Sequence, residues 1–410
     1  MRRASLTPYL LPLLVACGGG GHAATSASAS SAVSSAAGSG GGGSGTSATT
    51  TTTTTSASSS SSGAGGKPGG TTPYVYVGAD DDTISVFALD RATGVLDPRG
   101  KVAAGANPSF LATDPAHRFL YAVNEGSAQV AAFSIDPATG LLTFLDRKSS
   151  QGDGPAYVSV DHAGAWALVA NYGGGTVAVL PILPDGSLGD AVDVQSPGVN
   201  PHSIRADPTN HFAFVPCKGS DHVAQFLFDA QTGKLTPNSP ASVATAAGAG
   251  PRHLEFHPGL PVVYVIDENG HALDTYALDA AHGTLSPKAM VSTLAAGVDG
   301  SGTFSADLHL RPDARFLYGS NRGDDTLAIF AVDPVSGAAT PAGHVATGGS
   351  WPRNFGIDPE GEILLVANQH AGTVVSFRVD AATGLPGQLG MMPTTGKPAW
   401  VGVITQPKGP

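Results

Sequence analysis

The sequence predicts an all-β fold, a seven-bladed β-propeller built from four-stranded blades. Three observations lead to this prediction: a glycine turn that recurs along the chain, short apolar runs that alternate with polar residues, and an incomplete repeat at each end. Repeats of about 40–50 residues that each supply a small sheet are typical of propellers. Helices do not compete, because no window carries helical periodicity for long enough.

The recurring turn is written DRATGVL, DPATGLL and DAATGLP in three of its copies. Its glycines are Gly94, Gly140, Gly186, Gly233, Gly283, Gly337 and Gly384. The spacings between them are 46, 46, 47, 50, 54 and 47 residues. Seven copies at this period predict seven blades.

Each copy contains strands with period-two alternation. FLYAVN is an example of the first strand of a copy, and VAAFSID is an example of the second. A short third strand follows the glycine turn. Another strand, usually introduced by proline, precedes each copy, as in NPSFLATD, GPRHLEFH and WPRNFGID. The count is therefore four strands in each unit.

The two ends of the repeat region are complementary. YVYVGAD near residue 74 lacks a preceding strand, and KPAWVGVI near residue 397 has no strands after it. We expect these segments to complete one blade and close the ring. A β-solenoid, the competing architecture, gives no reason for such a split blade.

The residues before the repeats are of a different kind. Residues 1–17 predict a signal peptide whose end, Leu-Val-Ala-Cys, resembles a bacterial lipobox with Cys17 as the lipidated residue. The alternative is a secretory signal that is cut near HAATSAS, which would give a periplasmic or secreted protein. Residues 18–72 are rich in Ser, Thr, Gly and Ala and predict a disordered tether. Residues 73–410 form the predicted propeller, exported and held at the cell envelope by a lipid anchor.

Charge and cysteine content limit the function of the propeller. The whole chain has 21 basic and 32 acidic residues, and nearly all of them lie in the repeat region. An acidic surface argues against nucleic acid as a partner, because phosphates need basic groups. Only Cys217 lies in this region, so stability must come from packing rather than from a disulfide. We expect a monomer that meets the membrane only through its anchor.

One end of the central channel is richer in functional groups than the other. Antiparallel neighbours place the start of one strand beside the end of the next, so residues after the introducing proline meet residues that end the second strand. This mouth collects His202, Arg252, His253, Glu268 and Arg322. The opposite ends carry Asp-Pro turns such as DPAHR and DPTNH, which are typical of plain connections. We interpret the mouth as a small-molecule site, although a wet propeller mouth is often polar without a function.

At these residues the chain resembles the seven-bladed β-propeller lactonase family, of the 6-phosphogluconolactonase and carboxy-muconate cyclase type. The matching stretches include NPHS, GPRHLEFHP and TGGSWPRNFGIDPEGEILLVANQ, and the resemblance spans about residues 74–403. It implies a catalytic group of His202, Arg252, Glu268 and Arg322. Departures are DENG, PCKG and Asp307, and they put the substrate in doubt. Four residues complete the candidate site as substrate contacts: His253, Arg353, Asn321 and Asn171.

The resemblance implies hydrolysis of a small sugar or organic-acid lactone. Water must lose a proton, to Glu268 or His202, and the carbonyl oxygen gains negative charge, which Arg252 or Arg322 would stabilise. This chemistry requires no metal or organic cofactor, and we expect none. The alternative is a non-catalytic binding propeller for a carbohydrate or protein partner at the cell envelope.

Overall fold

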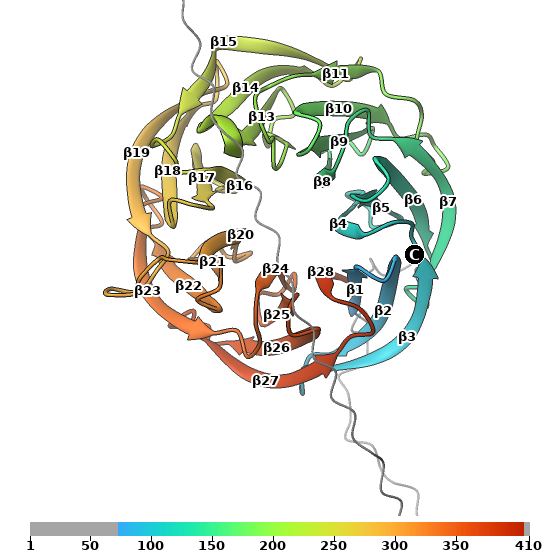
Figure 1. The fold of residues 1–410 in the computed structure, drawn as a ribbon, viewed down its shortest axis with the longest axis vertical. Helices are drawn as coiled ribbons and strands as arrows, with labels where there is room; N and C mark the ends of the chain where they lie inside the picture. Colours follow the sequence, from blue (N-terminus) through green and yellow to red (C-terminus); the bar gives the residue numbers. More distant parts are fainter. Residues whose placement is uncertain (1–72, 406–410) are drawn as a thin grey trace, which may run out of the picture. The chain divides into compact units, whose positions relative to one another are not determined.

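The computed structural model describes residues 73–405 of the chain. They form seven antiparallel sheets of four strands each, arranged as a ring around a channel (Figure 1). The predicted seven-bladed propeller is therefore confirmed. The segments predicted as signal peptide and tether, Cys17 among them, and the last five residues lie outside the described residues.

Each blade runs outward from its inner strand. The blade that closes the ring contains β28 (Pro398–Thr405), β1 (Pro73–Ala79), β2 (Thr83–Asp90) and β3 (Val95–Ala103). The second blade contains β4 (Pro108–Thr113), β5 (Phe119–Asn124), β6 (Gln129–Ile135) and β7 (Leu142–Ser149). The third contains β8 (Pro155–Val160), β9 (Trp166–Asn171), β10 (Thr176–Pro181) and β11 (Asp193–Gln195). The fourth contains β12 (Arg205–Ala206), β13 (Phe212–Cys217), β14 (His222–Asp229) and β15 (Lys234–Ala244). The fifth blade contains β16 (Pro251–Phe256), β17 (Val262–Asp267), β18 (Ala272–Asp279) and β19 (Thr284–Ser292). The sixth contains β20 (Phe304–Leu310), β21 (Phe316–Arg322), β22 (Thr326–Val332) and β23 (Ala339–Ala346). The seventh contains β24 (Pro352–Ile357), β25 (Ile363–Asn368), β26 (Thr373–Val379) and β27 (Pro386–Pro393). A single 3₁₀ turn, η1 (Lys218–Ser220), interrupts the strands of the described region.

The ring closes as predicted, by pairing the two ends of the repeat region. Strand β28 lies antiparallel to β1, with Val75 opposite Val403 and Val77 opposite Val401. In Figure 1 the red C-terminal strand lies beside the blue N-terminal one. No blade of the described region is therefore left without an inner strand.

The recurring glycines serve both the turn and the packing of one blade on the next. Gly140 has φ of 71° and Gly283 has φ of 64°, which favour glycine. A Cβ on Gly140 would meet the ring of Tyr74 at 2.4 Å, and one on Gly283 would meet the ring of Phe212 at 2.0 Å. The preceding blade therefore packs directly onto these turns, and glycine is required for two reasons.

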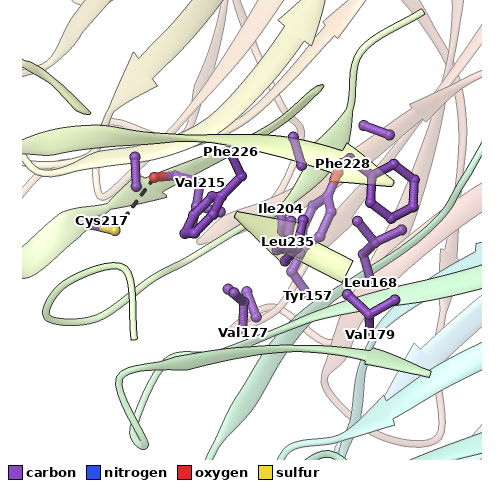
Figure 2. Packing of buried hydrophobic residues seen from close by; sticks show 14 residues of the cluster. Tyr157, Leu168, Val177, Val179, Ile204, Val215, Cys217, Phe226, Phe228 and Leu235 are labelled. Carbon is purple, nitrogen blue, oxygen red and sulfur yellow. Dashed lines mark hydrogen bonds between the residues drawn. The ribbon is translucent and has the colours of Figure 1, made fainter. Parts of the chain in front are cut away.

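The core lies between neighbouring sheets. In one such layer, Leu168 and Val177 of one blade meet Val215 and Phe226 of the next, and all are nearly or fully buried (Figure 2). Cys217 belongs to this layer, where burial raises the pKa of its thiol to about 12. It is packed as an apolar residue, not presented as a nucleophile.

The inner strand of one blade is shorter than the sequence pattern predicts. NPHSIRAD resembles the other introducing strands, yet only β12 and an isolated bridge between Pro201 and Cys217 pair with β13. The His202 amide bonds to the Pro216 carbonyl at 2.9 Å, and the Ser203 hydroxyl bonds to the Arg252 carbonyl at 2.9 Å. These contacts replace the regular ladder and leave His202 at the channel mouth.

Candidate active site

Two positions in the repeat supply the groups at the mouth, and the first is a β-bulge. In the blade of β16, Pro251 pairs with Asp267 and His253 pairs with Ile266, so Arg252 has no partner in the ladder. Arg353 has the same position at the start of β24. A bulge twists the strand and re-aims the extra side chain, which explains why each long guanidinium leaves the sheet here.

The second position is the end of each second strand, either its last residue or the residue directly after it. Lys218 follows β13, Glu268 follows β17 and Arg322 ends β21. The Glu268 amide bonds to the Gly250 carbonyl at 2.8 Å, and the Lys218 amide bonds to the Asn200 carbonyl at 3.0 Å. These bonds hold the residue after the second strand beside the introducing proline, so the two positions face each other as predicted.

Glu268 is the centre of an ion-pair cluster that joins three blades. One of its carboxylate oxygens lies 2.7 Å from Nζ of Lys218. The other lies 3.1 Å from Nε of Arg252 and 3.1 Å from Nη2 of Arg322. Only 7% of Glu268 and 2% of Arg252 is exposed. The structure therefore brings together three of the four residues that the sequence predicts as catalytic.

Burial and mutual contact set the charge of this cluster. Burial alone raises the pKa of Glu268, but Arg322, Arg252 and Lys218 outweigh it and hold the pKa at about 2. Burial and the Arg322 charge lower the pKa of Arg252 to about 9. Burial also lowers the pKa of Arg322, although Glu268 opposes this effect. At neutral pH the carboxylate is ionised and the guanidinium groups are cationic.

His202 lies beside the cluster in an aromatic contact chain. Its ring lies 5.3 Å from that of Tyr172 and 5.2 Å from that of His253, measured between centroids. Burial and the Arg252 charge hold its pKa well below the usual range, so the imidazole is neutral. Within residues 73–405, its buried Nδ1 has no hydrogen-bond partner. A neutral imidazole with an unpartnered nitrogen is able to accept a proton.

The wider mouth carries an excess of positive charge. Nη2 of Arg353 in the blade of β24 lies 3.1 Å from the Glu125 carboxylate in the blade of β4, which is two blades further along the ring. The guanidinium of Arg322 lies 5.4 Å from the ring of Trp351, which has φ of 64°. Lys218 and the three arginines therefore outnumber the two carboxylates, in a protein with a formal net charge of −11. The mouth is suited to an anion or to an oxygen that gains negative charge.

Asn171 and Asn321, predicted as substrate contacts, are fully buried and bonded to the backbone. Nδ2 of Asn171 donates to the Ser150 carbonyl at 2.7 Å, and that of Asn321 donates to the Thr293 carbonyl at 2.7 Å. Neither residue belongs to the ion-pair cluster. Each of these bonds holds the end of a second strand against the segment that follows the outer strand of the preceding blade.

The strand pattern also places two charged residues at the mouth that the candidate site did not include. Lys218 lies in the stretch PCKG and Glu125 lies in NEGS, at the same repeat position as Glu268. That shared position was the available signal, because a pattern that places Glu268 at the mouth places Lys218 and Glu125 there too.

No group of three His, Cys, Asp or Glu residues in the described region is arranged to hold a metal ion. In the same region, no helix is long and apolar enough to cross a membrane.

Comparisons with known proteins agree on one family. The family model described as a seven-bladed β-propeller lactonase matches residues 71–403. A 6-phosphogluconolactonase of Pectobacterium carotovorum is 35% identical over 230 residues, which cover 56% of this chain and 68% of the relative. The corresponding Bacillus subtilis protein is 33% identical over 274 residues, covering 64% and 77%. The solved structure of a periplasmic gluconolactonase from Pseudomonas aeruginosa is 31% identical, with a TM-score of 0.77 over 82% of this chain and 100% of that one.

Proposed function

The chain belongs to the seven-bladed β-propeller lactonase family, and from this membership we propose that its mouth hydrolyses the ester of a small lactone. The relatives and the structural neighbour named above are 6-phosphogluconolactonases and a gluconolactonase. The chain is thus a lactonase-like hydrolase, and the proposal concerns which residues act and on what.

The observation that carries the proposal is that two arginines form ion pairs with Glu268 beside a neutral His202. Glu268 holds two guanidinium groups within 3.1 Å of one carboxylate oxygen, so both cations converge on one place. Because its pKa is about 2 and both oxygens are engaged, Glu268 is a poor proton acceptor. His202 is neutral and has an unpartnered nitrogen. We therefore assign proton abstraction to His202 and orientation of the arginines to Glu268.

The proposed reaction uses these groups in the following way. His202 takes a proton from water as the water oxygen bonds to the lactone carbonyl carbon. The carbonyl oxygen becomes negative, and Arg252 and Arg322, which are largely buried, stabilise it. When the ring C–O bond breaks, the leaving oxygen takes the proton from His202. The product is the open hydroxy acid, and the imidazole is neutral again.

The positive excess at the mouth favours a substrate that carries an anion or many hydroxyl groups. Arg353 and Lys218 remain for a carboxylate, a phosphate or the hydroxyls of a sugar acid, and a guanidinium binds a planar or tetrahedral anion through a fork of donors. A sugar-acid lactone, with or without a phosphate, is the substrate class that fits.

A substrate panel tests this function. Purified protein would be assayed by acid release against sugar, sugar-acid, phosphorylated and aromatic-acid lactones, with Arg252→Ala beside the wild type. We expect hydrolysis of at least one sugar-acid lactone, well above the uncatalysed rate and lost in the variant. If a folded protein hydrolyses none of them, the binding-propeller alternative is the better description.

We further propose that the protein is exported and anchored through Cys17 as a monomer. The support is the sequence of residues 1–17 and the export implied for the periplasmic relative by its description. In the native host, the wild type should fractionate with membranes and Cys17→Ser should not. Equal membrane association of both forms would contradict the anchor.

A further inference from the structure

The residue before the introducing proline lies in an equivalent turn in five blades. These residues are Asn107, Gly154, Asn200, Gly250 and Trp351, and their φ values are 54°, 55°, 52°, 66° and 64°. The carbonyl of each accepts a hydrogen bond from the amide of the residue after the second strand of the same blade, at 2.8 to 3.1 Å. The backbone of these turns is therefore equivalent, and what differs is the side chain that each presents at the mouth.

Trp351 is the exception among these five residues. A positive φ suits glycine, and asparagine tolerates it, whereas a bulky side chain in this conformation is strained. The turn is held by a hydrogen bond from the Trp351 amide to the Asp325 carboxylate at 2.7 Å. The turn at Asn107 has the same support, from Asp82 at 2.9 Å. Glycine or asparagine therefore satisfies the fold at this position, and a residue that breaks such a local rule points to a functional role.

The indole of Trp351 packs against Arg322. The guanidinium carbon lies 5.4 Å from the centre of the indole and 5.7 Å from that of the Phe304 ring. The imidazole of His370 stacks on the indole at 4.4 Å, with an interplanar angle of 14°. We propose that Trp351 is a positioning residue, held in a strained turn so that its indole fixes the plane of the Arg322 guanidinium for catalysis. This role rests on the proposed function, in which Arg322 stabilises the negative oxygen of the transition state.

Polar contacts hold Arg322 along one edge of its guanidinium. Nε donates to the Phe304 carbonyl at 3.3 Å, and Nη2 donates to the Ser305 carbonyl at 3.2 Å and lies 3.1 Å from the Glu268 carboxylate. Within residues 73–405 these contacts leave Nη1 for the substrate. A planar group held along one edge can tilt about that edge, and an aromatic ring that packs against it limits the tilt. The side chain of Arg322 is 11% exposed, and Trp351 is one of the groups that cover it.

Trp351→Asn separates positioning from support of the fold. Asparagine is the residue that two other blades have in this turn, and Trp351 is only partly buried, so the melting temperature should not fall below that of the wild type. The ring is lost, so kcat should fall by about 10-fold to 100-fold, the size expected when a catalytic group is misplaced by about 1 Å. KM should change little, because the negative oxygen exists only in the transition state. A raised KM with unchanged kcat, or a melting temperature several degrees lower, would overturn the inference.

Two phenylalanine variants complete the comparison. Trp351→Phe keeps a planar ring and the strained turn, so it should retain most of the turnover that Trp351→Asn loses, with no gain in melting temperature. Trp166 is the matched control, because it packs in the hydrophobic layer between two blades and its Nε1 donates to the Ala230 carbonyl at 2.8 Å. Trp166→Phe should leave kcat and KM unchanged. Equal turnover in the two Trp351 variants would show that the ring does not position Arg322.

A double-mutant cycle tests whether the effect passes through Arg322. In an Arg322→Ala background, Trp351→Asn should cost no further activity, because the guanidinium that the indole positions is gone. An equal fold-loss in both backgrounds would show that Trp351 acts independently of Arg322, which would contradict the proposed role.

Chemical modification probes the guanidinium without a substrate. Phenylglyoxal adds to arginine side chains, and peptide mass spectrometry gives the rate at each residue. Arg322 should react several-fold faster in Trp351→Asn than in the wild type and Trp351→Phe, whereas Arg99, whose side chain is 47% exposed, should react equally in all three. An unchanged rate at Arg322 overturns the inference whatever the activity. Absence of lactonase activity in the wild type would instead contradict the proposed function, and the modification rate would still decide whether Trp351 holds Arg322.

Discussion

At the scale of single residues, His202 determines how activity should depend on pH. A base must be neutral to act, and burial with the Arg252 charge holds the His202 pKa well below 6.5. The acid limb of kcat/KM should therefore lie well below pH 6.5, with a plateau through neutral pH. In Glu268→Gln the arginine charges lose their compensation, so the limb should move to still lower pH while turnover falls. A limb at or above pH 6.5 would argue against His202 as the base.

Asp267 gives a second prediction at this scale. In four other blades the same position is an asparagine, whose amide bonds to a carbonyl just after the outermost strand of the preceding blade: Asn124, Asn171, Asn321 and Asn368. Asp267 is 1% exposed, and neither carboxyl oxygen has a partner within residues 73–405. Burial, with Asp274 and Asp221, raises its pKa to about 8. The folded state therefore binds a proton that the unfolded state releases near pH 4.

This linkage fixes the sign of the effect. Between about pH 4 and pH 8 the native state holds more protons at this site, so its contribution to stability falls as pH rises. Asp267→Asn removes that dependence and restores the amide donor. Melting temperature should rise by a few degrees at pH 8 and by less at pH 5. A lower melting temperature at pH 8 would show that the carboxylate is stabilised in a way the structure does not contain.

The sequence predicted which residue types meet at the mouth but not how they pair. Arg252, Glu268 and Arg322 could be placed on one rim because the repeat fixes their strand positions. The ion pair from Lys218 to Glu268 and the bonds from Asn171 and Asn321 to backbone carbonyls depend on side-chain directions that alternation does not specify. The bulge that frees Arg252 is a register shift of one residue, which no periodic pattern reveals.

At the scale of elements, buried tyrosines on the second strands join one blade to the next. Hydroxyls of Tyr76, Tyr121, Tyr264 and Tyr318 donate to the carbonyls of the recurring glycines, as from Tyr264 to Gly337 at 2.7 Å. Tyr264→Phe removes the donor and leaves a buried carbonyl, which should cost about 1–3 kcal/mol of unfolding free energy. Chemical denaturation measures it. Tyr74→Phe is the control, because its partly buried bond to Ala138 is open to replacement by water and its loss should cost less.

The elements themselves were largely predictable, because glycine turns and alternation act locally. Each recurring glycine has a positive φ, and each introducing proline begins an inner strand or lies at its start. The exception is the segment before β13, where NPHSIRAD has the strand pattern but only Arg205 and Ala206 pair regularly. There the side chain of Ser203 bonds to the neighbouring blade instead, a contact between strands about 50 residues apart that a local pattern cannot show.

At the scale of the whole molecule, closure of the ring by β28 should determine stability. Ala399, Val401 and Ile404 are 1%, 1% and 5% exposed, and β28 pairs along the whole of β1. Removing residues 397–410 exposes the edge of β1. It also loses burial worth about 1–3 kcal/mol for each large apolar side chain. That loss is a substantial part of the free energy of unfolding of a typical domain, which is about 5–15 kcal/mol. We expect a protein that aggregates or melts at least several degrees lower, whereas removing only 406–410 leaves melting unchanged. Equal melting temperatures for the two truncations would contradict closure by β28.

The central claim, that one cluster at the mouth of the ring performs lactone hydrolysis, has a direct measurement. It is kcat/KM of Arg252→Ala and Glu268→Gln on the best lactone of the panel, with melting curves to verify folding. The matched control is Glu360→Gln, which changes an exposed carboxylate that is paired with Arg91. Loss of one group that stabilises an oxyanion typically costs about 100- to 1000-fold in turnover. We predict losses of that size for Arg252→Ala and Glu268→Gln and none for Glu360→Gln. Folded Arg252→Ala and Glu268→Gln proteins with wild-type kcat/KM would contradict the claim.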